Sequence, residues 1–171
     1  PQCMSRYFFR NPDKLLEKIR GDDALYFEFQ WHYRLPSEAF FDIGQLLHWT
    51  DVMINASDSD ADKVTLVGSI LGKAPDGDDG IFPIETVRKL LKIKKNEELT
   101  TAVARGKINS LGLRDVEDGK KEREKSDIYK MQARAMEIDY PQTSVILRIL
   151  ANFYERESKR DQISSEIEPL Q

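Results

Sequence analysis

The second half of the chain carries apolar residues at the three- and four-residue spacing of an α-helix. Separate series follow Pro83, Asn96, Lys120 and Pro141. Proline fits the first turn of a helix, and an asparagine side chain can accept a hydrogen bond from a free backbone N–H there. The link between the last two series is only about three residues long, which predicts an antiparallel helical hairpin.

The first half gives a mixed pattern. Asn11-Pro12-Asp13 predicts a helix that ends at Gly21, and residues 36–55 predict a second helix with a wide apolar face. Residues 24–33 alternate between apolar and polar side chains and are rich in aromatics, which is typical of a strand with one buried face. Residues 64–71 are rich in β-branched side chains and predict another strand. A helix remains an alternative for both segments.

These segments predict a mostly α fold with a small β component, of the α+β class. The length of 171 residues suits one globular domain over residues 1–171, with 164–171 as a flexible tail. A content of 40% hydrophobic and 33% charged residues indicates a folded, soluble protein. Its apolar runs are only a few residues long, whereas a membrane-spanning helix needs roughly 20, so no membrane association is expected.

The single cysteine, Cys3, excludes an internal disulfide and a zinc site built on several thiolates. The first ten residues lack the basic start, apolar middle and small-residue cleavage site of a secretory signal. Together these features favour a cytoplasmic location.

Charge is distributed unevenly along the chain. Residues 36–80 carry 2 Lys/Arg and 9 Asp/Glu, whereas residues 81–125 carry 12 and 8. The basic stretch offers candidate contacts to nucleic acid or to a protein partner: Arg88, Lys89, Lys92, Lys95, Arg105 and Lys107. Against nucleic acid, the pI is about 5.3 and the stretch between Thr86 and Ile108 has no aromatic side chain to stack on a base. A solvated helix face explains such a run as well.

Two acidic clusters raise the question of a metal ion, because hard cations bind several carboxylate oxygens. The carboxylates concerned are Asp58, Asp60, Asp62, Asp76, Asp78 and Asp79. Neither cluster matches a calcium-binding loop, since Lys63 and Ile81 occupy the positions where that loop requires glycine. We therefore expect solvated turns, no metal and no cofactor.

His48 and Asp51 are our candidate catalytic pair, because their helical spacing lets a carboxylate orient an imidazole. No serine or cysteine motif supplies a nucleophile for such a pair, and no glycine-rich phosphate loop is present. The sequence therefore favours a protein-interaction or regulatory domain without catalytic activity, bound to a protein partner or to a second copy of itself. A nucleic-acid-associated factor and, after it, an enzyme built around His48 and Asp51 are the alternatives.

Overall fold

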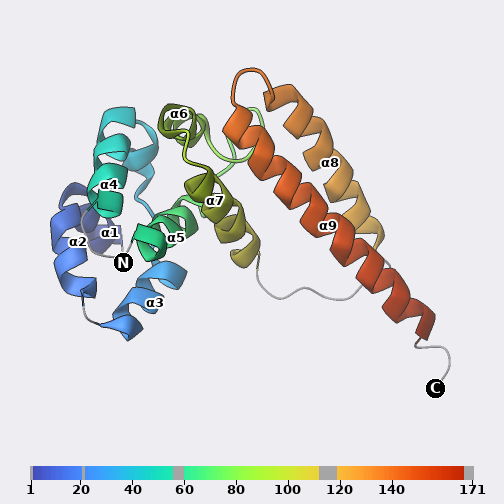
Figure 1. Cartoon of the computed structure of the whole chain (residues 1–171), viewed down its shortest axis with the longest axis horizontal. Coiled ribbons are helices and arrows are strands. Elements are labelled where there is room, and N and C mark those ends of the chain that lie inside the picture. The colour runs from blue at the N-terminus through green and yellow to red at the C-terminus, as the bar shows by residue number, and fades with distance from the viewer. Residues whose placement is uncertain (1, 21, 56–59, 112–118, 168–171) are drawn as a thin grey trace.

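The computed structural model describes residues 2–20, 22–55, 60–111 and 119–167 (Figure 1). All regular structure in these ranges is helical. The helices are α1 (Gln2–Arg10), α2 (Pro12–Ile19), α3 (Asp23–His32), the short 3₁₀ helix η1 (Ser37–Phe40), α4 (Ile43–Asn55), α5 (Asp60–Leu71), α6 (Glu85–Lys94), α7 (Glu97–Asn109), α8 (Lys120–Met136) and α9 (Pro141–Ile167). None of the helices in the described part of the chain is long and apolar enough to cross a membrane.

The expected β component is wrong, because both predicted strands are helices. Residues 24–32 lie in α3 and Tyr33 caps its end; its start is capped by the Asp22 carboxylate, which accepts a hydrogen bond from the Leu25 N–H at 3.0 Å. Phe29 and Tyr33, one turn apart, pack their rings 5.6 Å from each other. Helix α3 contacts both α2 and α5, and Tyr26 and Phe29, which are three residues apart, are partly buried against the core. The alternating pattern is therefore compatible with a helix as well as with a strand.

Residues 64–71 belong to α5 rather than to a strand. This helix contacts α3, α4 and α7, and Val64, Leu66, Val67 and Leu71 are all buried. Burial on several sides explains the continuous apolar run, and it outweighs the weak preference of β-branched residues for strands.

The helices predicted for the second half are confirmed. Asn96 caps α7, with its side-chain oxygen 2.8 Å from the Leu99 backbone nitrogen. The hairpin of α8 and α9 forms as expected, but α9 continues to Ile167, so residues 164–167 of the predicted tail are helical. Residues 168–171 lie outside the described residues. In the first half, the helix expected over residues 36–55 is divided into η1 and α4.

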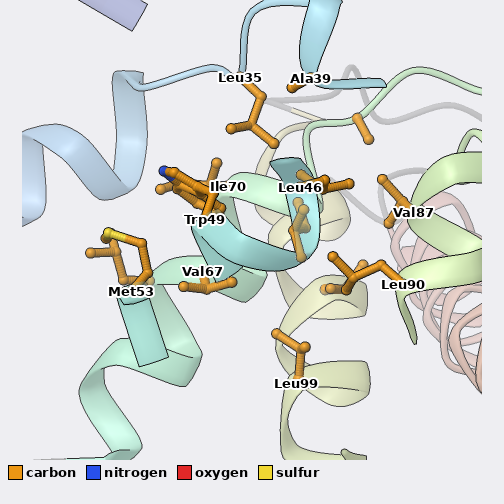
Figure 2. Close-up of a cluster of buried hydrophobic side chains, with 14 of the residues drawn as sticks. Leu35, Ala39, Leu46, Trp49, Met53, Val67, Ile70, Val87, Leu90 and Leu99 are labelled. Atoms are coloured by element: carbon orange, nitrogen blue, oxygen red, sulfur yellow. The ribbon is translucent and has the colours of Figure 1, made fainter. Parts of the chain in front are cut away.

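The core lies where α4, α5, α6 and α7 meet. Figure 2 shows Trp49, Ile70, Leu90 and Leu99 converging there from these four helices, and all of them are buried. Helices α5 and α7 cross very closely, because a Cβ atom added to Gly68 would lie 2.2 Å from that of Ala102.

The hairpin forms a separate layer beside this core. Helix α9 packs on α6 and α7, while α8 packs chiefly on α9. Figure 1 shows α8 on the outer side of the hairpin and the far end of α9 extending away from α7. One long side of α8 is therefore turned away from the rest of the chain.

Candidate interaction surface

Arg88, the first of the basic candidates, is buried, with 3% of its surface exposed. Its guanidinium donates two hydrogen bonds to the Asp79 carboxylate, at 2.6 and 2.7 Å. It also donates to the backbone carbonyls of Pro83, at 2.5 Å, and Ile81. Arg88 thus fastens the 79–83 loop to α6. The expectation that Arg88 is available to contact nucleic acid or a protein partner is wrong, because the sequence does not reveal that this loop covers it.

The remaining basic candidates do not act as one group. Lys89 pairs with Glu85 at 3.0 Å, and the Lys107 ammonium lies 3.3 Å from Asp76 and 4.2 Å from the centre of the Phe82 ring. Within the described ranges, Lys92, Lys95 and Arg105 make no ion pair, and all three are exposed. With Arg88 buried and Lys107 held against Asp76 and Phe82, the exposed cations that remain of this candidate set are Lys89, Lys92, Lys95 and Arg105.

The structure does not bring His48 and Asp51 together as a catalytic pair. The Asp51 carboxylate accepts a hydrogen bond from Lys94 and so links α4 to α6. His48 is exposed on α4. The structure shows no hydrogen bond between the two side chains, which are both within the described part of the chain. Asp51 therefore acts as a link between helices.

The acidic candidates fall into different environments. Asp58 lies outside the described residues, and the side chains of Asp60 and Asp62, in the first turn of α5, are not described either. Asp76 pairs with Lys107, Asp79 with Arg88, and Asp78 is exposed. The described residues contain no group of three or more histidine, cysteine or acidic side chains that could hold a metal ion.

An apolar surface that sequence reasoning did not place runs along α8. We name it the α8 stripe, and it consists of Ile128, Met131, Ala135 and Ile138. Ile128 is 49% exposed, Met131 65% and Ile138 91%, and Ala135 is exposed as well. Ile138 lies in the turn after Met136, the last helical residue, where the Tyr140 N–H bonds to the Met136 carbonyl at 2.9 Å, so it extends the stripe beyond the end of the helix. The periodicity that predicted this helix therefore marks its solvent-facing side.

The opposite side of α8 faces α9 and combines the Tyr129 ring, stacked on Tyr154 at 5.6 Å, with small and polar side chains. The buried Ser126 hydroxyl donates to the Ala151 carbonyl at 3.0 Å, and the Ser144 hydroxyl of α9 donates to the Ala133 carbonyl at 2.8 Å. Small side chains let the two helices approach closely. Glu122, near the start of α8, is buried as well. Helix α8 thus buries polar and small residues while it exposes its largest aliphatic ones.

A cavity of about 270 Å³ lies where α3, α5 and α7 end. Its lining includes Arg34, Ser69 and Lys73. The Lys73 ammonium donates hydrogen bonds to the backbone carbonyls of Gln30 and of Tyr33, the latter at 3.3 Å. Burial, together with the nearby Arg34 charge, lowers the pKa of Lys73 to about 8. Because its ammonium binds the last carbonyls of α3, Lys73 ties the end of that helix to α5.

A wider hollow of about 530 Å³ lies between η1, the 77–79 loop, the start of α6 and the end of α8. Phe41, Met136 and Tyr140 contribute apolar surface to it, and Asp78 and Glu85 contribute carboxylates. Arg88 closes its base through the pair with Asp79.

No protein-family model, no curated protein and no solved structure matches this chain.

Proposed function

We propose that this protein is a protein-interaction domain and that the α8 stripe is its docking surface. The observation that carries the proposal is the inverted arrangement of α8, in which Ser126 is buried against α9 while Ile128, two residues later, is exposed on the other side of the helix. Single exposed apolar residues are common on protein surfaces. A row of them along one helix face is instead typical of a surface that another protein covers.

The chemistry of the stripe specifies the kind of partner. Its exposed side chains are aliphatic or thioether groups at positions 128, 131, 135 and 138, which one face of a second helix can cover. Fully burying an isoleucine or methionine side chain contributes about 1.5–3 kcal/mol. Because Ile128, Met131 and Ile138 are already partly covered, we expect roughly 3–6 kcal/mol from this side of the contact.

Association of two proteins costs about 4–15 kcal/mol in lost translational and rotational freedom. The α8 stripe alone therefore cannot hold a partner that presents a polar surface. The partner must supply a comparable apolar helix face, and the resulting complex should be reversible.

Site-specific photocrosslinking in cells that express the protein tests this function. A benzophenone amino acid replaces Met131 in the stripe, or Ile163 as the control, because Ile163 is also exposed, at 59%, but lies on α9 and outside the stripe. We expect a discrete protein adduct of defined mass from position 131 that disappears when Ile138→Glu is added. Equal labelling from both positions, or an adduct unaffected by Ile138→Glu, would contradict the proposal.

A further inference from the structure

The spacing of the α8 stripe is the same in both chain directions. Its residues are separated by three, four and three positions, so the stripe is symmetric about position 133. A surface with this symmetry is complementary to itself when two copies meet around a two-fold axis. We propose that the partner is a second copy of this chain, with the two α8 helices paired antiparallel; this inference rests on the proposed function.

Antiparallel pairing matches large side chains with small ones. It places Ile128 of each copy opposite Ile138 of the other, at the two ends of the stripe. In the middle, Met131 lies opposite Ala135 of the second copy, so a long side chain meets a methyl group. Parallel pairing would place the Met131 side chains of the two copies against each other, which crowds that layer. It would also place Ala135 against Ala135, which leaves a gap in the next layer.

Charges beside the stripe favour the same direction. Lys125 and Asp139 lie seven residues to either side of Gln132, so helical spacing places them on one flank of the stripe, with Asp139 in the turn that follows α8. In an antiparallel pair, Lys125 of each copy therefore lies opposite Asp139 of the other, and this attraction occurs twice. In a parallel pair, Lys125 would instead lie near Lys120 of the second copy. The Lys125 ammonium lies 5.3 Å from the centre of the ring of Tyr154 on α9, so it would leave this contact to reach Asp139 of a second copy.

One contact on the opposite flank works against the pair. Arg134 lies next to the centre of the stripe, so the two copies bring their Arg134 side chains together near the two-fold axis. Like charges at this distance repel each other. Replacing Arg134 with a neutral residue should therefore strengthen the dimer, so the proposal also predicts a variant that binds more tightly.

The size of the surface sets the expected affinity. Helix α8 has 17 residues, which corresponds to a length of about 25 Å. A contact between two such helices lies at or below the lower end of the roughly 1,200–2,000 Å² buried in stable complexes. We therefore expect a reversible dimer that dissociates in the micromolar range.

Sedimentation equilibrium of the full chain over a wide concentration range measures this dimer directly. We expect Ile138→Glu to raise the dissociation constant at least 10-fold, Ile163→Glu to leave it unchanged and Arg134→Gln to lower it. Ile138 is so exposed that its replacement should not alter the thermal melt, and Met131→Gln repeats the test at a second position. A monomer at every concentration, or equal effects of Ile138→Glu and Ile163→Glu, would overturn the proposal.

Disulfide trapping decides the direction of pairing. Cys3 is the single cysteine, so a Cys3→Ser background contains no other thiol. Chains carrying Met131→Cys and Ala135→Cys are then mixed and oxidised gently. We expect the mixed disulfide between positions 131 and 135 to form faster than either homodisulfide. Preferential disulfides between two copies of position 131 would show parallel pairing and overturn the proposal.

The two proposals fail in different ways. A monomeric protein that still gives a stripe-dependent photocrosslink to a different protein would overturn self-pairing and support the interaction function. Absence of a stripe-dependent adduct at position 131 together with a monomer in sedimentation would remove both.

Discussion

Replacing Asp79 with asparagine should lower the free energy of unfolding by about 2 kcal/mol. Removing one partner of a fully buried ion pair costs about 3–5 kcal/mol, because the other charge is left without compensation. Arg88 is buried, but the Asp79 side chain is 45% exposed, so water can replace part of the lost interaction. The guanidinium also keeps its hydrogen bonds to the Pro83 and Ile81 carbonyls. Both facts place the expected loss below the range for a buried pair.

The same ion pair makes a specific prediction about pH. Hydrogen bonds from Arg88 lower the pKa of Asp79 from 3.8 to about 2. A carboxyl group whose pKa is lower in the folded protein stabilises the fold above its unfolded pKa, and this stabilisation is lost as the pH falls through the folded value. The difference between wild type and Asp79→Asn should therefore be complete at pH 6 and should shrink as the pH approaches 2.

Denaturant unfolding followed by circular dichroism at pH 6 and at pH 2.5 measures both effects. Asp78→Asn is the matched control, because Asp78 is an exposed neighbour in the same loop that makes no ion pair with any residue the structure describes. A destabilisation by Asp79→Asn that equals that of Asp78→Asn at pH 6 would refute the structural role of Arg88. A difference that does not shrink at pH 2.5 would refute the electrostatic explanation.

The remaining predictions concern the helix packing. Gly106→Ala should destabilise the protein by about 1–3 kcal/mol, because the new Cβ would lie 2.7 Å from the Ser69 Cα at the crossing of α5 and α7. Gly44→Ala, at an exposed position, should have little effect in the same thermal melts. Leu150→Ala should cost about 2–5 kcal/mol in denaturant unfolding, because Leu150 is fully buried on α9, and Ile163→Ala should change stability by less than about 0.5 kcal/mol. The pKa of Lys73 is about 8 in the folded protein, against an ordinary value of 10.5. Between these two pH values the unfolded chain binds more protons than the folded protein, so this group makes the free energy of unfolding rise with pH. Unfolding measured from pH 7.5 to 9.5 should show this rise in wild type and a weaker one in Lys73→Met; equal slopes would contradict the pKa assignment.

The sequence was most informative where a regular spacing and a capping residue agreed. Asn96 and the stripes that follow Pro83 and Pro141 predicted α6, α7 and α9, because one turn of helix repeats the same side of the chain every three to four residues. Alternation over residues 24–33 could not separate strand from helix, since the outcome depended on contacts of α3 with both α2 and α5.

Tertiary structure decided which side of each helix faces the protein. The basic stretch made Arg88 a candidate contact residue, but a loop that begins nine residues earlier covers it and supplies Asp79. The spacing of Ile128, Met131 and Ile138 predicted α8, yet the helix turns these residues to solvent and packs Ser126 against α9. Periodicity determines which side chains share a face, because that follows from helix geometry alone. What covers the face depends on the other elements, whose positions result from the packing of the whole chain.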